Sequence, residues 1–330
     1  MDMEILRERA RIIRQVRSFF DSKNYLELDT PLLSPDLIPE SCLEVFETER
    51  ITPGGGSTPY WLIPSPEIWM KKIIAQHHVN VYQVCKCFRN GESAGFLHSP
   101  EFTMLEYYTM NADYMDSLAL TEDLFRALAG NAPSPLSLPF DRITVAEAFS
   151  RYAGFDLSAA AETPKGPEKS ASLEAEARRL GLDPARGESA STLYDLIFIH
   201  AVEPKLKQDR VIALLDYPSF VPTLAKKSAD GKTVERWELY FNGIELANCY
   251  SEETDPRRVR GFFESEAVIK KRQSAVNHRV DHDYWKLFEK QNGFPACSGV
   301  ALGLDRLIMA VCSLSSIDSV LPFPMSDIKK

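Results

Sequence analysis

The spacing of apolar residues predicts a helix at the start of the chain and a short strand after it. Between residues 4 and 20, apolar side chains recur near helical spacing with arginines between them. Residues 25–30 then alternate as a strand does, and the run stops at Pro31. The glycine-rich stretch 52–59 predicts a mobile turn or loop, and residues 66–76 predict a second helix with Pro66 in its first turn.

Two hairpins are the clearest β signals in the sequence. The runs 79–89 and 101–109 flank a polar loop that contains glycine, and residues 236–250 fold back at Asn242-Gly243, a dipeptide typical of two-residue hairpin turns. Residues 299–304 predict a further strand that leads into an apolar helix. Helical patterns also cover 112–130, 191–208 and 257–291. Hairpins interrupted by helices predict an α+β fold with an antiparallel sheet.

Length and one weakly patterned region suggest the domain organisation. The chain has 330 residues, which is enough for one large domain. Residues 157–190 are rich in Ala, Glu, Pro, Ser and Gly and carry no recognisable chemistry. We therefore expect a single domain over 1–330 with a variable helical insertion at about 110–235, whose least specified part is 157–190.

Composition argues against several classes of protein. The net charge is −9, whereas a protein that clamps bare nucleic acid usually has a basic excess. The six cysteines lack the spacing of a disulfide framework or a zinc site. The beginning of the chain contains no long apolar run. We therefore expect a cytoplasmic protein without a membrane segment.

The first group of chemically suggestive residues lies on the hairpin 79–109. Because side chains alternate along a strand, an aromatic, a thioether, a carboxylate and a phenol share one face of the second strand. An arginine ends the first strand, and the loop carries a glutamate and a histidine. Such a set suits a nucleotide, although a surface hairpin with incidental charges would look the same. These residues are Phe102, Met104, Glu106, Tyr108, Arg89, Glu92 and His98.

The second group is a pair of carboxylates on the hairpin 236–250. A two-residue turn at Asn242 would place Tyr240 opposite Glu245, and Glu238 opposite Ala247. Glu238 and Glu245 would then lie diagonally on one face, within reach of a shared cation. Two carboxylates among apolar side chains need a positive partner, and hard oxygen ligands favour Mg²⁺. The alternative is a solvent-facing polar side of the hairpin.

The third group is the run from Gly299 to Arg306. Small residues alternate at Gly299, Ala301 and Gly303, which lets a flat ligand approach the backbone closely. Arg306 follows at the junction of strand and helix, where the helix N-terminus suits phosphate. The run is weak evidence alone, and it gains strength from the two hairpins before it.

In order and separation, these groups resemble the three motifs of class II aminoacyl-tRNA synthetases. Motif 1 resembles the helix and strand up to Pro31, motif 2 resembles CFRNGE…HSPEFTMLEYY, and motif 3 resembles GVALGLDRL. Within the class, SPEIWMKK, PEFTMLEYY and GIELANCYSE are similar to the lysine subgroup. The resemblance implies an antiparallel sheet flanked by helices, use of ATP and Mg²⁺, an acyl-adenylate product and a homodimer formed through motif 1.

Two features narrow the resemblance. Lysyl-tRNA synthetases carry an N-terminal anticodon-binding barrel, whereas here the motif 1 helix begins almost at the first residue, so we expect no such domain. Lysyl-tRNA synthetases resemble one another in having glycine at the position of Ala301, where the ligases described next have alanine. The sequence is thus most similar to their truncated paralogues, the elongation factor P–(R)-β-lysine ligase family. This implies β-lysine or lysine as substrate, elongation factor P as acceptor and no tRNA.

Two alternatives stay open. The same chemistry could serve a tRNA or a small-molecule acceptor, and a regulatory paralogue could bind an amino acid without catalysis. The pair of phosphate-type arginines, Arg89 and Arg306, argues against a pure binder.

The resemblance also implies roles for the matching residues on the ATP side. Arg89 would contact the α-phosphate, Arg306 the terminal phosphate, and Phe102 would lie under the adenine ring. Glu92 would lie near the adenine amine, and Mg²⁺ would be bound by the two hairpin carboxylates. The ATP-binding set implied in this way is Arg89, Glu92, His98, Ser99, Phe102, Glu245, Leu246, Gly303 and Arg306, with Glu238 and Glu245 as metal ligands.

On the amino-acid side, acids at opposite ends of a narrow pocket suit a diamine. Glu67 would meet the amine near the substrate's carboxylate, and Tyr108 with Glu252 would hold the distal ammonium. The full substrate set implied is Ser65, Pro66, Glu67, Glu106, Tyr108, Asn248, Glu252 and Ala301. The motif 2 loop departs from the family, since Gly91 intervenes before Glu92, Leu97 replaces an arginine of the lysyl enzymes and Ser99 replaces an asparagine.

Overall fold

The structure is a computed structural model that describes residues 2–91, 95–129, 136, 138–161, 171–207, 209–289 and 293–325. One eight-stranded sheet with the order β1-β5-β6-β11-β10-β9-β8-β7 forms its centre. The strands of that sheet are β1 (Leu26–Glu27), β5 (Val81–Phe88), β6 (Glu101–Met110), β7 (Asp141–Thr144), β8 (Ile212–Pro218), β9 (Thr233–Phe241), β10 (Ile244–Ser251) and β11 (Cys297–Gly303). A smaller sheet has the order β2-β4-β3, with β2 (Leu33–Ser34), β3 (Glu47–Thr52) and β4 (Gly56–Leu62).

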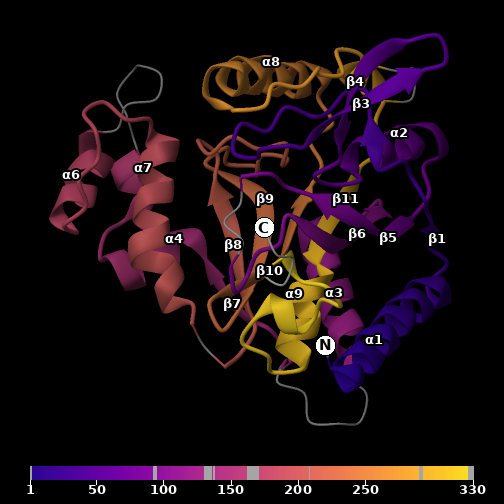
Figure 1. Ribbon diagram of the computed structural model, residues 1–330. Coiled ribbons are helices and arrows are strands. Elements are labelled where there is room, and N and C mark those ends of the chain that lie inside the picture. The colour runs from indigo at the N-terminus through magenta and orange to yellow at the C-terminus, as the bar shows by residue number, and fades with distance from the viewer. Residues whose placement is uncertain are drawn as a thin grey trace.

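Helices cover both faces and one end of the large sheet (Figure 1). The α-helices are α1 (Met3–Ser22), α2 (Glu67–His77), α3 (Tyr114–Ala129), α4 (Val145–Ala148), α5 (Leu157–Ala161), α6 (Ala171–Arg179), α7 (Ala190–Ile197), α8 (Pro256–Gln273) and α9 (Leu304–Val311). Short π or 3-10 turns are η1 (Phe149–Ala153), η2 (Phe198–Val202), η3 (Glu203–Lys205), η4 (Tyr284–Leu287) and η5 (Ile317–Ser319). Only the outermost pairs, β1–β5 and β7–β8, are parallel, so the expected α+β fold with an antiparallel sheet is confirmed.

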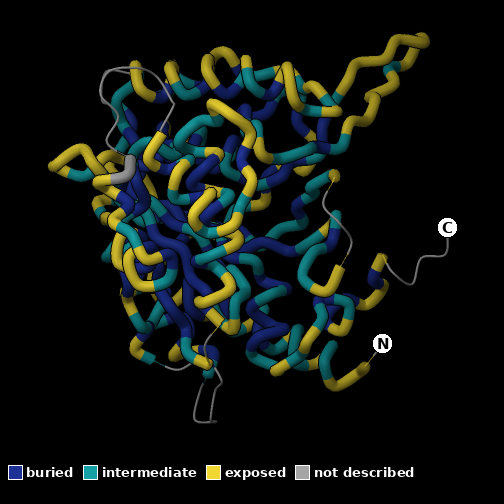
Figure 2. The backbone as a smooth tube through the Cα atoms, turned by 90° about the vertical axis from the view of Figure 1, so that its left-hand side faces the viewer, coloured by how far each residue is buried: buried dark blue, intermediate teal, exposed yellow. Residues whose placement is uncertain are grey.

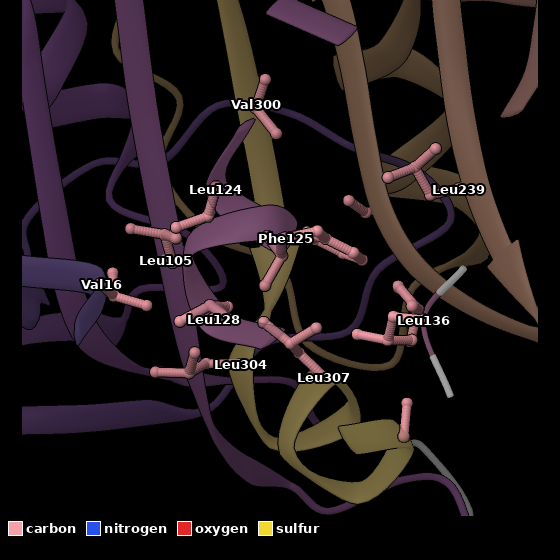
Figure 3. Close-up of a cluster of buried hydrophobic side chains, with 14 of the residues drawn as sticks. Val16, Leu105, Leu124, Phe125, Leu128, Leu136, Leu239, Val300, Leu304 and Leu307 are labelled. Carbon is pink, nitrogen blue, oxygen red and sulfur yellow. The ribbon is translucent and has the colours of Figure 1, made fainter. Parts of the chain in front are cut away.

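One face of the sheet packs on α1, α3 and α9 and forms the largest core. Alternation sends Leu105 of β6 and Val300 of β11 to this face, where they meet Leu124 and Phe125 of α3 and Leu307 of α9 (Figure 3). These five side chains are 0% exposed. Burial of this apolar area stabilises the sheet from behind and leaves its other face for chemistry.

The opposite face is covered partly by α2 and α8. Ile68 and Met70 of α2 pack with Val259 and Phe263 of α8 in a separate core that also includes Tyr108 of β6. A third core, formed by α4–α7, β7 and β8, lies beyond the far edge of the sheet, at the left of Figure 1. Figure 2 shows the buried strands running through the middle of the molecule. The functional face is therefore the one between the central strands and the α2–α8 layer.

Three local predictions were wrong. The strand expected at 25–30 is reduced to Leu26–Glu27, and the turn or loop expected at 52–59 is confined to residues 53–55, because Thr52 pairs with Gly56 at the tip of the β3–β4 hairpin. The helix expected at 257–291 ends at Gln273. It ends there because the Glu44 carboxylate accepts the backbone N–H groups of residues 275 and 276, a tertiary interaction that a local pattern does not reveal.

Candidate active site

Two adjoining cavities open on the functional face of the sheet. The larger has a volume of about 340 Å³ and the smaller about 100 Å³. Residues that line the larger include Arg89, His98, Ser99, Phe102, Glu238, Glu245, Leu246, Gly303 and Arg306. Residues that line the smaller include Ser65, Glu67, Glu106, Tyr108, Tyr250, Glu252 and Gly299. Both cavities are lined by Glu40, Arg89, Met104, Asn248 and Ala301, which mark their common boundary.

The alternation of β6 and β11 explains why these residues meet. Phe102, Met104, Glu106 and Tyr108 project from one face of β6, as predicted. Gly299 lies opposite Tyr108 in the neighbouring strand β11. A Cβ atom at Gly299 would lie 2.5 Å from Cε1 of Tyr108, so only glycine leaves space for the ring. The small residues of β11 thus provide room for β6 side chains as well as for a ligand.

A β-bulge in β10 corrects the predicted register of the second hairpin. Glu245 lies opposite Tyr240 as expected, but Glu238 lies opposite Asn248 and not Ala247. The register shifts between Glu245 and Ala247. One extra residue reverses the alternation beyond it, so Glu245 and Asn248 can face the same side although their spacing is odd. This bulge is what allows one strand to line both cavities.

The two predicted phosphate-binding arginines line the same cavity. The Arg89 guanidinium lies over the Phe102 ring, 5.2 Å from its centroid. Arg306 donates hydrogen bonds from Nη1 to the carbonyl oxygen of Glu245, at 2.9 Å, and from Nε to that of Leu97, at 3.1 Å. These bonds fix the Arg306 side chain beside the half-exposed Glu245 carboxylate, with 3.9 Å between Nη1 and Oε2. The cavity therefore receives one guanidinium group from the end of β5, at Arg89, and another from just beyond the end of β11, at Arg306.

Glu238 finds its positive partner inside the protein. Its Oε2 accepts hydrogen bonds from the hydroxyls of Tyr217, at 2.5 Å, and Tyr240, at 2.8 Å. Its Oε1 pairs with Arg236, which also lies over the Tyr217 ring. Arg236 therefore supplies a positive partner of the kind expected for this carboxylate, and neutralisation of Glu238 does not by itself require a metal ion. Within the described residues no cluster of three or more His, Cys, Asp or Glu side chains has metal-binding geometry.

A fully buried lysine that was not predicted from the sequence lies behind the acids that line the smaller cavity. Nζ of Lys71 lies 2.5 Å from the Glu67 carboxylate and 2.6 Å from Oε2 of Glu252. It also lies over the rings of Tyr108 and Tyr250. Although burial opposes it, the attraction of Glu252 and Glu67 raises the pKa of Lys71 well above its usual value. Lys71 thus joins the two acids that were predicted to bind opposite ends of a substrate.

Two carboxylate oxygens of the smaller cavity remain without a protein partner. Tyr108 donates its hydroxyl to Oε1 of Glu106 at 2.7 Å, which leaves Oε2 of Glu106 unpaired. Oε1 of Glu252 is also buried and unpaired. Burial raises the pKa of Glu106 well above its usual value, and it raises that of Glu252 to about 8 despite the opposing charge of Lys71. Such acceptors favour a ligand that carries ammonium groups.

The predicted site residues differ in whether they line a cavity. Pro66 caps α2 and lines neither cavity, and Glu92 lies outside the described residues. All other members of the two predicted sets line at least one cavity. Four residues at or beside the cavities were not predicted from the sequence, namely Glu40, Lys71, Arg236 and Tyr250. A signal existed for Lys71 alone, since it follows Glu67 by four residues on a predicted helix.

An ion pair at the wall of the larger cavity fixes motif 3 to the first helix. Arg9 of α1 pairs with the buried Asp305, whose other oxygen accepts the backbone N–H of Thr103 at 2.7 Å. Arg9 also donates to the Thr103 hydroxyl at 2.8 Å. The segment that begins α9 is thereby held against β6, and Arg306 projects from that segment.

Comparison with known proteins agrees with this arrangement. Residues 2–327 match the family described as tRNA synthetases class II (D, K and N). A protein of Avibacterium paragallinarum named elongation factor P–(R)-beta-lysine ligase is 34% identical over 98% of this chain and 96% of its own length. Proteins of the same name from Pasteurella multocida and Haemophilus influenzae (strain PittGG) are also 34% identical, over 97% and 99% of this chain and 95% and 96% of their own lengths.

Proposed function

Because the chain belongs to the class II tRNA synthetases of the D, K and N group, in the branch of the elongation factor P–(R)-β-lysine ligases, we propose that it is an ATP-dependent ligase. It activates (R)-β-lysine as an acyl-adenylate and transfers the acyl group to a lysine side chain of elongation factor P. One observation carries the chemistry: a cavity lined by the guanidinium groups of Arg89, Arg236 and Arg306 adjoins a smaller cavity lined by the acids Glu67, Glu106 and Glu252.

The first step is the attack of the amino acid carboxylate on the α-phosphate of ATP, with pyrophosphate as the leaving group. Arg89 at the boundary of the cavities is positioned to stabilise charge at the α-phosphate, and Arg306 suits the terminal phosphate. Phe102 provides a flat surface for the adenine ring. In such a site catalysis consists of positioning and charge stabilisation, without a covalent enzyme intermediate.

The smaller cavity supports a substrate with two ammonium groups. Glu67, Glu252 and Tyr108 all line this cavity, and the carboxylates of Glu67 and Glu252 lie close together, because both contact the Lys71 ammonium. A neutral amino acid would leave the buried unpaired oxygens of Glu106 and Glu252 without a cation. Ala301 lines both cavities, and at their boundary it would lie beside the backbone end of the substrate, where α- and β-amino acids differ.

One of the two predicted Mg²⁺ ligands, Glu245, is available to bind the ion. Glu245 presents a half-exposed carboxylate to the larger cavity, whereas both oxygens of Glu238 already have partners. Mg²⁺ is commonly bound by one or two carboxylates together with substrate phosphates. Glu245 would hold the ion, with Glu238 as a second ligand only if it released Arg236. The ion would supply charge neutralisation on the phosphates.

The proposal extends to assembly and location. β1 is an edge strand, its Leu26 is exposed, and the exposed Val79 precedes Asn80, whose carbonyl oxygen accepts the Leu26 N–H; this supports a homodimer formed through the α1–β1 region. All six cysteines are free thiols, in keeping with a cytoplasmic location. Among the described residues no helix is both apolar and long enough to cross a bilayer.

The test is to follow each step separately. The purified protein should exchange pyrophosphate into ATP when (R)-β-lysine or lysine is present, and mass spectrometry should detect the acyl group on elongation factor P. A parallel reaction with tRNA separates the two acceptors. Exchange without transfer to elongation factor P, but with transfer to tRNA, would contradict the proposed acceptor. No exchange with either diamine would contradict the proposed activity.

A further inference from the structure

Glu40 lies where the two cavities join. Of the five residues that line both cavities, Glu40 is the one with a carboxylate. Its backbone is fixed by α8, because Lys270 donates to the carbonyl oxygens of Glu40, at 3.1 Å, and of Leu43, and because Oε2 of Glu266 accepts the N–H of Ser41 at 3.0 Å. A loop held in this way can present its side chain at a defined position.

The Glu40 carboxylate differs from the other acids of the cavities in its contacts with the protein. Within the described parts of the chain it makes no hydrogen bond or ion pair, whereas Glu67 pairs with Lys71 and also accepts the Tyr250 hydroxyl at 3.1 Å. Burial and the charge of Glu67 raise the pKa of Glu40 to about 7. Arg89 and Lys270 oppose this rise, while Glu266 adds to it. Glu40 can thus both hold and release a proton near neutral pH.

The reacting carbon of the acyl-adenylate must lie at the same boundary. The phosphate-binding arginines line the larger cavity and the ammonium-binding acids line the smaller, so the carbonyl that joins the two halves spans the junction. A lysine amine is protonated at neutral pH and becomes a nucleophile only after it loses a proton. The attack also releases a second proton from nitrogen. A base at this point would therefore contact the reacting atoms.

We propose that Glu40 is the general base of the transfer step, an inference that rests on the proposed function. The acceptor amine enters in its neutral form, having given one proton to water, and attacks the carbonyl carbon. As the N–C bond forms, the Glu40 carboxylate takes a proton from the nitrogen. The C–O bond to AMP breaks, AMP leaves with the bonding electron pair, and the amide and a protonated Glu40 remain.

The competing role is ammonium binding. Glu40 lies close enough to Glu67 for their charges to interact, so it could instead bind the substrate amine. The two roles differ in which step they affect. An ammonium-binding residue contributes to activation and transfer alike, whereas a base for the acceptor amine contributes to transfer alone.

Glu40→Gln keeps the shape of the side chain and removes its basicity. We expect pyrophosphate exchange with (R)-β-lysine to stay within about threefold of the unmodified protein, and single-turnover transfer to elongation factor P to slow by about 10²–10⁴-fold. Glu40→Asp should recover part of the transfer rate. Deprotonation of the acceptor amine makes the transfer rate rise with pH in both proteins, but in the unmodified protein the rise should be steeper below about pH 7 than above it, and this change of slope should be absent from Glu40→Gln. Glu49→Gln, an exposed carboxylate on β3, is the matched control for the change in charge.

Equal losses in exchange and transfer would overturn the proposal in favour of ammonium binding. An unchanged transfer rate in Glu40→Gln would overturn it as well. Failure of the proposed function looks different, because the unmodified protein would then show no exchange or no transfer. Thermal unfolding of each variant identifies any loss that comes from misfolding, and the exchange activity of Glu40→Asp provides a second check on the fold.

Discussion

Replacement of Lys71 by methionine tests the arrangement of the smaller cavity most directly. The substitution keeps the length of the side chain and removes an ammonium group that contacts Glu67 and Glu252. Side chains at both ends of the Lys71–Glu252 pair are 1% exposed. Removing one partner of a buried ion pair costs about 3–5 kcal/mol of the free energy of unfolding, because the other charge is left buried and alone.

The lower end of that range is expected for Lys71→Met. Burial already raises the pKa of Glu252 to about 8, so Glu252 can take up a proton when Lys71 is removed. For a chain of this length, a loss of 3–5 kcal/mol lowers the melting temperature by about 4–7 °C. The loss should be smaller at pH 6 than at pH 8.5, because protonation relieves the lone charge.

The matched control is Lys72→Met on the next position of α2. Lys72 pairs with Asp281 at 2.6 Å, but its side chain is 35% exposed, so the expected loss is below about 1 kcal/mol. Thermal or urea unfolding measures both. In a double-mutant cycle, Lys71→Met and Glu252→Gln should be non-additive by about 1–3 kcal/mol. Additive effects, or a Lys71 variant as stable as the Lys72 variant, would refute a direct pair.

Three further outcomes follow from the site. The KM for the diamine substrate in pyrophosphate exchange should fall as pH rises toward about 8 and then level off, since Glu252 binds an ammonium only when ionised; a flat profile would argue against Glu252 as the ligand. Gly299→Ala should reduce lysine activation at least about tenfold with little change in ATP affinity, because its Cβ would displace Tyr108. Arg306→Met should lower kcat by about 10²–10³-fold, and a loss confined to the KM for the amino acid would contradict its phosphate role.

The local sequence pattern was sufficient to predict which side chains share a face of a central strand. It was insufficient to predict the register between strands or the ion pairs that link them. Alternation along β6 placed Phe102 and Tyr108 on one face, and this depends only on the geometry of a strand. The bulge in β10 has no marker in the sequence, so the register beyond Glu245 was predicted wrongly. The ion pair between Arg236 and Glu238 was not predicted either. Predicting it would have required the side chains that share a face after the register shift to be known.

Loop residues posed a different problem. Glu40 sits in a segment without periodicity, and its position depends on hydrogen bonds to α8, which follows more than two hundred residues later. No local signal predicts such a contact. The identity of the fold, by contrast, was carried by three short motifs and is confirmed by the sheet and by the family match.

The bulge in β10 has a consequence for how the two cavities can evolve. The bulge shifts the alternation of side chains along the strand, so that Glu245 lines the larger cavity, which we propose holds the nucleotide, while Asn248 and Tyr250 line the smaller cavity, which we propose holds the amino acid. Substitutions after the bulge can therefore retune the choice of amino acid and leave the nucleotide end intact. Deletion of a single residue at the bulge would be far more damaging, because every side chain of the strand after the bulge would then turn away from the smaller cavity.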